Sequence, residues 1–131
     1  HQGNVAFFEE MAKRPHTIAP DALAKNTKPL TVEGVTQERV ITDGTMTVNL
    51  YAVTGAHSES MLIAYFPRQR ILVEADVYNP GGAVQMFAGE FLAGLKPHNL
   101  RVDRIAPLHG MVVPYAQLVK EASAPLPAAT K

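Results

Sequence analysis

Between residues 36 and 75 the chain either alternates hydrophobic and polar side chains or runs apolar over short stretches, a pattern typical of β-strands. An Asp-Gly pair at residues 43–44 interrupts the alternation and indicates a hairpin turn. Two more strand-like runs follow at residues 60–66 and 71–75, separated by the turn sequence Pro-Arg-Gln-Arg, and the second run is too apolar to face water. This part of the chain therefore predicts two consecutive β-hairpins.

The clearest helical pattern covers residues 84–95, where apolar side chains recur at the three- and four-residue spacing of one helix face. The members of this stripe that we expect to be buried are Val84, Phe87, Phe91 and Leu95. Their expected partners lie on the second hairpin and are Leu62, Ala64, Leu72 and Val73.

Two further helices and one strand complete the pattern. A helix is predicted from Asn4, a good N-cap residue, to residue 14, where a following proline disfavours helical geometry. The proline-containing connection after it has room for one helical turn at residues 21–25. A strand at residues 102–108 precedes a last helix that Pro114 opens. The order helix, hairpin, hairpin, helix, strand, helix predicts an α/β fold in layers, with helices packed on a sheet.

Composition excludes several classes of function. The 131 residues suffice for one domain with a core, and 12 Lys and Arg balance 12 Asp and Glu. A chain without a surplus of basic residues is not expected to bind nucleic acid or an anionic membrane. No apolar run approaches the roughly 20 residues that cross a bilayer. Cysteine is absent, so any metal must be held by His, Asp or Glu. We expect a soluble protein, in a compartment that the composition leaves open.

The two ends of the chain differ in character. The first residue is His1 rather than Met, and a helical pattern follows almost at once, so we expect the chain to begin inside a longer protein. Residues 123–131 are small and rich in proline, which predicts a disordered tail after an ordered domain of residues 1–122.

Three polar residues stand at junctions between predicted strands and loops, where a rigid scaffold commonly presents functional groups. His57 precedes one strand, Asp76 follows another, and His109 ends a third. If the strands of the second hairpin pair through their turn, the start of one lies beside the end of the other. That pairing brings His57 and Asp76 to the same end of the sheet.

Metal binding is the chemistry that such a set favours. Imidazole nitrogen and carboxylate oxygen are ordinary zinc ligands, and a carboxylate can bridge two ions. Taken singly, each residue has a plainer explanation, because a loop His is most often solvated and an Asp after a strand is most often a turn or cap residue.

Four segments carry a resemblance to a known family. They are Gly-Ala-His-Ser at residues 55–58, Ser-Met-Leu-Ile-Ala-Tyr-Phe-Pro at 60–67, Arg-Ile-Leu-Val-Glu-Ala-Asp at 70–76 and Pro-Leu-His-Gly at 107–110. Together they resemble the central stretch and the last ligand motif of the metallo-β-lactamase superfamily. By this resemblance His57 would bind a first metal ion, Asp76 would bridge two ions, and His109 would bind the second. The implied cofactor is zinc, as one or two ions.

The resemblance also has gaps. Ala75 and Leu108 stand where the family commonly has smaller residues, and neither change removes a ligand. The family's His-x-His-x-Asp-His motif is absent, and in family members it precedes a segment like residues 1–10. The resemblance therefore implies that residues 1–122 form the C-terminal half of a layered αββα sandwich. A missing N-terminal half or a second subunit would complete it.

Two neighbours of the candidate ligands are expected to support them. Ser58 resembles the small hydroxyl residue that often follows the family's His, with a hydrogen bond to a ligand as its expected role. Glu74 should point to the face opposite Val73 and Ala75, either as a similar supporting residue or as an exposed strand residue. The other histidines, His1, His16 and His98, lack a strand-end setting.

The sequence leaves two functions open, which belong to different classes of protein. The first, implied by the resemblance, is a metal-dependent hydrolase of the metallo-β-lactamase superfamily. In it, zinc-bound hydroxide would attack a small-molecule ester, thioester, amide or phosphoester. We expect this chain alone to be inactive. The second is a non-catalytic interaction or assembly module that keeps half of the fold and pairs its open apolar edges with another chain.

Overall fold

The computed structural model describes residues 1–15, 17–20, 22, 24–25, 28–82 and 85–123. The helices are α1 (Val5–Lys13), α2 (Ala88–Leu95) and α3 (Tyr115–Ala122), with short 3-10 helices at Gln2–Asn4 and Lys96–His98. The strands are β1 (Glu38–Thr42), β2 (Thr47–Val53), β3 (Met61–Phe66), β4 (Ile71–Glu74), β5 (Arg104–Pro107) and β6 (Val113–Pro114).

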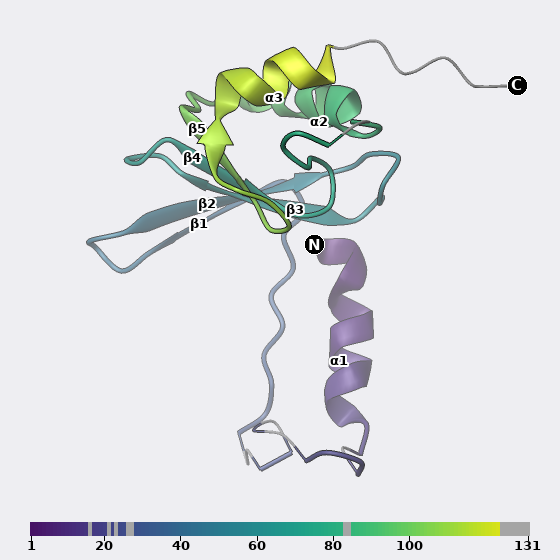
Figure 1. Ribbon diagram of the computed structural model, residues 1–131. Coiled ribbons are helices and arrows are strands. Elements are labelled where there is room, and N and C mark those ends of the chain that lie inside the picture. Colours follow the sequence, from purple (N-terminus) through teal and green to yellow (C-terminus); the bar gives the residue numbers. More distant parts are fainter. Residues whose placement is uncertain (16, 21, 23, 26–27, 83–84, 124–131) are drawn as a thin grey trace, which may run out of the picture.

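The six strands form one mixed sheet in the order in which they occur in the chain. Strands β1 to β4 pair antiparallel, which confirms both predicted hairpins, and β4 and β5 pair parallel across a crossover that contains α2. Helices α2 and α3 lie together on one face of the sheet, whereas α1 extends away from the other side (Figure 1). The predicted α/β class, with a mixed sheet and flanking helices, is confirmed.

The first hairpin turns where the Asp-Gly pair predicts it. The carboxylate of Asp43 accepts hydrogen bonds from the main-chain N–H groups of Met46 (2.7 Å) and Thr45 (2.8 Å), and Gly44 takes a positive φ of 89°. The bonds from Met46 and then Thr45 favour the charged carboxylate and lower the pKa of Asp43 to about 2. The hydrogen bonds of the turn thus favour the ionised form of Asp43.

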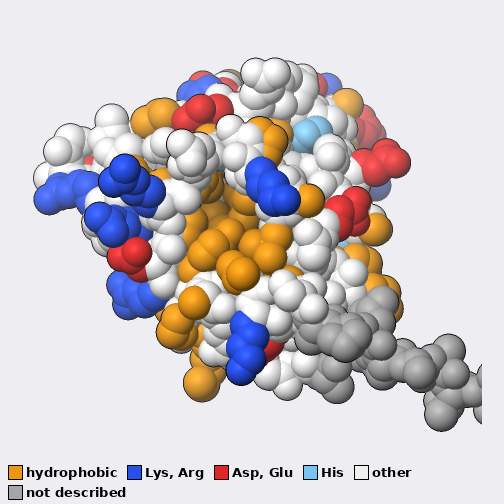
Figure 2. All heavy atoms as spheres, turned by 90° about the horizontal axis from the view of Figure 1, so that it is seen from above, with side chains coloured by type: hydrophobic (Ala, Val, Ile, Leu, Met, Phe, Trp, Pro, Cys, Tyr) orange, Lys and Arg blue, Asp and Glu red, His pale blue; other side chains and the backbone are white. Residues whose placement is uncertain are grey.

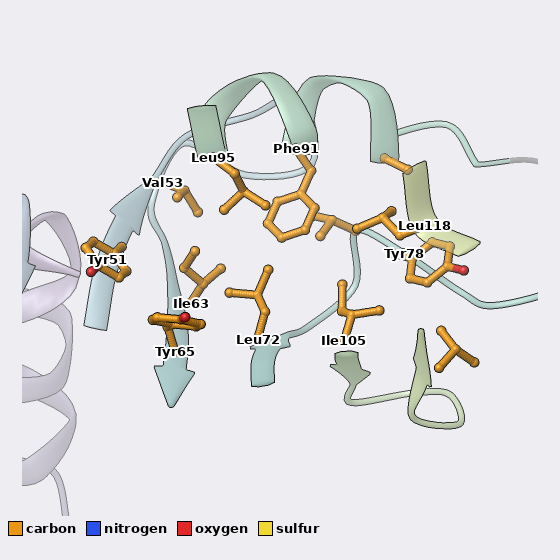
Figure 3. Close-up of a cluster of buried hydrophobic side chains, with 13 residues drawn as sticks. Tyr51, Val53, Ile63, Tyr65, Leu72, Tyr78, Phe91, Leu95, Ile105 and Leu118 are labelled. Carbon is orange, nitrogen blue, oxygen red and sulfur yellow. The ribbon is translucent and has the colours of Figure 1, made fainter. Parts of the chain in front are cut away.

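The core lies between the sheet and the helices α2 and α3. Phe91 and Leu95 project from α2 toward Ile63, Leu72 and Ile105, which stand on three neighbouring strands (Figure 3). The largest of the fully enclosed side chains are Leu72, Ile105 and Leu118. Of the expected helical stripe, Phe91 and Leu95 are buried, Phe87 is half-buried just before α2 begins, and Val84 lies outside the described residues.

The expected strand partners of this stripe are correct for Leu72 and wrong for Leu62, Ala64 and Val73. Tyr65 pairs with Leu72 in the sheet register, and paired residues share one face. Leu62, Ala64 and Val73 therefore point to the opposite face, where they are only half-buried. Both faces of β3 and β4 are apolar, so their alternation alone does not show which face the helices cover.

Helix α1 has the predicted start and end but contributes nothing to this core. Asn4 is its N-cap residue, and the chain becomes extended at Arg14, directly before a proline. The Asn4 amide donates to the main-chain oxygen of Ser60 at 3.3 Å instead of capping the helix. None of the α1 residues is buried, so the apolar side chains of Phe8 and Met11 have no cover. The helical turn predicted at residues 21–25 includes residues outside the described part. The predicted tail at residues 123–131 lies outside the described part from residue 124 onward.

Viewed from the side that carries α2 and α3, hydrophobic side chains gather in a hollow at the centre of the molecule, with Lys and Arg grouped along one edge (Figure 2). One pocket, of about 250 Å³, has the following described lining: Leu92, Leu95, Lys96, Asn99, Leu100, Val102 and Tyr115. This described lining includes none of the predicted site residues. None of the helices in the described part of the chain is long and apolar enough to span a membrane.

Candidate functional site

The structure brings His57, Asp76 and His109 together at one end of the sheet. The two carboxylate oxygens of Asp76 face different imidazoles: Oδ1 lies 2.8 Å from Nε2 of His109, and Oδ2 lies 3.8 Å from Nε2 of His57. Asp76 thus stands at the centre of the group, with one histidine on each side.

Strand topology explains why these residues meet. Because β4 and β5 run parallel, their carboxyl ends lie at the same edge, and Glu74 pairs there with Pro107. Asp76 and His109 each follow this pair by two residues. The antiparallel pairing of β3 with β4 brings the loop before β3, which carries His57, to the same end.

Asp76 adopts a backbone conformation that is uncommon for a residue with a side chain. Its φ is +72°, in the left-handed region that favours glycine. Asp and Asn tolerate this region better than most residues, but it still costs free energy, and the surrounding structure must hold it. Such outliers cluster at functional sites, which marks Asp76 independently of its neighbours.

All three side chains are open to solvent. The exposed fractions are 34% for His57, 46% for Asp76 and 67% for His109, so a bound molecule could reach each of them. The ring of Phe87 lies edge-on to the His57 imidazole, with 5.0 Å between ring centroids. This contact fixes one side of His57 and leaves its Nε2 directed toward Asp76.

Two hollows meet at this group. The larger, about 370 Å³, is lined by His57, Asp76, Val77, Tyr78, Asn79, Gln85, Met86, Phe87 and His109. The smaller, about 270 Å³, is lined by His57, Ser58, Met61, Leu62, Ala75 and Asp76. The smaller one includes Leu62, which lies on the sheet face that α2 and α3 do not cover. His57 and Asp76 therefore border both faces of the sheet end.

Glu74 points away from Val73 and Ala75, as expected, and this direction buries it beneath the helices at 3% exposure. Its Oε2 accepts a hydrogen bond from the main-chain N–H of Val77 at 3.0 Å, and its Oε1 is buried without a hydrogen-bond partner. Burial is the main cause that raises the pKa of Glu74 above its ordinary value. The alternative of an exposed strand residue is wrong.

The remaining predicted candidates lie in other settings. The Ser58 hydroxyl oxygen accepts from the N–H of Ser60 at 3.2 Å, so it serves the turn of its own loop. His1 accepts from the N–H of Gly3 at the N-terminus, and the His98 ring packs against Tyr51 at a tilt, with 4.5 Å between ring centroids. His16 lies outside the described residues.

Sequence reasoning missed two glutamates near the site. Glu90, in the first turn of α2, accepts a hydrogen bond from the main-chain N–H of Ala56 at 2.8 Å, in the loop that carries His57. Glu121, on α3, accepts from the Tyr78 hydroxyl at 3.0 Å and from the N–H of Gly81 at 3.2 Å. Burial, followed by the contact with Glu121, raises the pKa of Tyr78 to about 12. A sequence shows such glutamates only as ordinary polar residues of a helix.

The donor atoms of the group suit zinc, but they do not make up a complete site. Nitrogen and carboxylate oxygen are the ligand types that zinc takes in proteins. Among the residues that the structure describes, however, no group of three or more His, Asp or Glu is arranged to hold a metal ion. The 2.8 Å between His109 and Asp76 is a direct contact, shorter than two zinc–ligand bonds at a tetrahedral angle allow.

Comparison with known proteins supports the fold. No protein-family model matches the chain, and no curated protein matches it in sequence. Among solved structures, the chain is similar to a metallo-beta-lactamase from Pontibacter korlensis, with a TM-score of 0.52 and 18% sequence identity. The match covers 76% of this chain and 51% of that one, so the chain spans about half the length of the structure it resembles. The mixed six-stranded sheet with flanking helices is thus a partial metallo-β-lactamase-like fold.

Proposed function

We propose that this chain is part of a metal-dependent hydrolase. The observation that carries the proposal is the placement of Asp76, whose two carboxylate oxygens each face the Nε2 of a different histidine at the end of the sheet. A carboxylate between two imidazoles has the donor types of a site with two metal ions. The partial metallo-β-lactamase-like fold adds support at the level of fold.

In this proposal each residue has a defined part. His57 would hold one ion through Nε2, His109 would hold the other, and Asp76 would contribute one carboxylate oxygen toward each. Bound zinc lowers the pKa of a water ligand and polarises the bond to be cleaved. The pocket of about 370 Å³ beside the three residues would receive a small-molecule ester, thioester, amide or phosphoester.

The proposal requires further ligands, because two protein ligands per ion do not make a zinc site. A segment N-terminal to this chain in the whole protein, or a second subunit, would supply them. The hollow of about 270 Å³ that His57 and Asp76 share with Leu62 lies toward the sheet face that α2 and α3 do not cover. Further ligands could approach Asp76 there without displacing α2 or α3.

The test has a genetic part and a biochemical part. The coding sequence upstream of His1 should encode a His-x-His-x-Asp-His motif. The protein that carries it should bind zinc and hydrolyse at least one ester, thioester, amide or phosphoester of a test panel. His57→Ala, Asp76→Ala and His109→Ala should each lose zinc, whereas His98→Ala, which removes the ring that packs against Tyr51, should keep it. Equal zinc content in all four variants would disprove the site.

The assembly module remains the second candidate because of one observation. Val40 and Ile41 on the edge strand β1, and Phe7 and Phe8 on α1, are large hydrophobic side chains exposed to solvent. An edge strand with unpaired main-chain groups can pair with another chain. A protein without zinc or hydrolase activity that associates through β1 would favour this function, and sedimentation analysis with a Val40→Lys variant would test it.

A further inference from the structure

The loops that carry His57 and Asp76 are each fastened by one carboxylate from a neighbouring element. Glu90 of α2 accepts the N–H of Ala56, directly before His57. Glu74 of β4 accepts the N–H of Val77, directly after Asp76. In both cases the carboxylate binds the main chain beside a candidate ligand and not the side chain of that ligand.

The setting of Glu74 indicates a role beyond filling space. A carboxylate at 3% exposure is costly to bury, and this one accepts the Val77 N–H through Oε2 while its Oε1 has no hydrogen-bond partner. What it fastens is the turn in which Asp76 holds its left-handed conformation. In addition, the main-chain oxygen of Glu74 accepts the N–H of Leu108 at 2.9 Å, directly before His109. The Glu74 carboxylate therefore fastens the loop of Asp76, whereas the loop of His109 is held by a main-chain bond that any residue at position 74 would make.

The contact of Glu90 with Ala56 holds the loop of the third candidate ligand, His57. Its carboxylate lies 2.8 Å from the Ala56 nitrogen, and a Cβ placed on Gly55 would lie 3.7 Å from the Glu90 carboxyl carbon. The loop therefore packs directly against the first turn of α2. That turn follows Phe87, whose ring contacts the His57 imidazole. His57 is thus fixed to α2 by its main chain and by its ring.

We infer that Glu74 and Glu90 are positioning residues, whose carboxylates hold the loops of Asp76 and His57, respectively, in place at the end of the sheet. The consequence for metal binding rests on the proposed function, but the positioning itself does not. Carboxylates that support metal ligands from outside the coordination sphere typically change metal affinity by 10- to 100-fold when they are removed.

The first experiment measures amide hydrogen exchange by NMR in the metal-free protein, for Glu90→Ala, Glu90→Gln, Glu74→Ala and Glu74→Gln. Glu90→Ala should speed exchange at Ala56 by about two- to tenfold, the effect of one lost hydrogen bond, and leave Val77 unchanged. Glu74→Ala should show the reverse pattern. Each Gln variant keeps an acceptor oxygen and should restore protection. Glu59→Ala, an exposed carboxylate near His57, is the matched control and should alter neither amide.

The second experiment measures zinc affinity in the complete protein. Glu90→Ala should weaken zinc binding by 10- to 100-fold, and Glu90→Gln should recover most of the loss. If Glu74→Ala does not fold, the inference is tested with Glu74→Gln, Glu90→Ala and Glu90→Gln.

Unchanged exchange at Ala56 in Glu90→Ala would overturn the inference, as would equal zinc affinity in Glu90→Ala and Glu59→Ala. Altered exchange in a complete protein that takes up no zinc would instead confirm the positioning and contradict the proposed function.

Discussion

Nε2 of His109 lies 2.8 Å from Oδ1 of Asp76, although the two residues belong to loops that leave different strands. The parallel pairing of β4 with β5 sets this distance, because Glu74 and Pro107 are register partners two residues upstream. The contact depends only on this chain. Any further group that completes the site would therefore meet a pair that is already formed.

Zinc should bind only weakly to the 131-residue chain alone. The chain offers His57 and Asp76 toward one ion and Asp76 and His109 toward the other, fewer than the three protein ligands that zinc sites use. We expect low affinity, ready loss to a chelator and little hydrolysis, with recovery when the completing segment is added. Isothermal titration with zinc measures this. Tight uptake of two ions per chain would contradict it and would direct attention to His1, His16 or a neighbouring subunit.

Phe91→Ala should destabilise the fold by about 3–5 kcal/mol, because the ring is 4% exposed between α2 and the sheet and its removal leaves a cavity. The matched control is Phe7→Ala on α1, where the ring is 62% exposed and the change should cost under about 0.5 kcal/mol. Urea unfolding followed by circular dichroism gives both values. Equal costs would mean that α2 does not cover the core.

Gly110→Ala should cost about 1–3 kcal/mol, because a Cβ at this position would lie 2.7 Å from Cδ of Pro80 and force the two loops apart. Gly89→Ala in α2 is the control, since its Cβ would lie 3.7 Å from the nearest atom and alanine favours the helix by about 0.5–1 kcal/mol. Thermal unfolding of the two variants should therefore shift in opposite directions. A shift in the same direction would contradict the close approach of the loops.

Asp43→Asn should remove one acid-dependent loss of stability. The folded pKa of Asp43, about 2, lies below its ordinary value of 3.8, so the charged carboxylate stabilises the fold above about pH 4. That contribution is lost as the pH falls from about 4 through 2. Unfolding free energies measured across this range should fall more steeply for the wild-type protein than for the variant. Parallel curves would show that the turn does not depend on the charge.

The hairpins and helices could be predicted because their signals are local. The Asp-Gly turn, the alternation through β1 and β2, and the apolar stripe containing Phe91 and Leu95 each act within a few residues. The side of the sheet that the helices cover is not a local property. Ile63 and Leu62 are both apolar neighbours on β3, and the direction of the crossover after β4 decides which of them is buried.

The candidate site also has features that local sequence signals predict and features that depend on long-range packing. The ends of strands predict where His57, Asp76 and His109 lie, because the topology carries strand ends to a common place. The contact between Glu90 and Ala56 could not be predicted, since it depends on how α2 lies over a loop far away in the sequence. In the sequence Glu90 resembles any acidic residue that favours the first turn of a helix.

The parallel pairing of β4 and β5 also has a consequence for folding kinetics. The hairpins from β1 to β4 close through short turns, whereas β5 can join β4 only after the chain through residues 75–103, including α2, has folded back over the sheet. Long-range parallel pairing of this kind is slow, because the entropy of closing the connection is lost before any contact is gained. His109 should therefore reach Asp76 in the last phase of folding, well after the loop of His57 has taken its place beside β4.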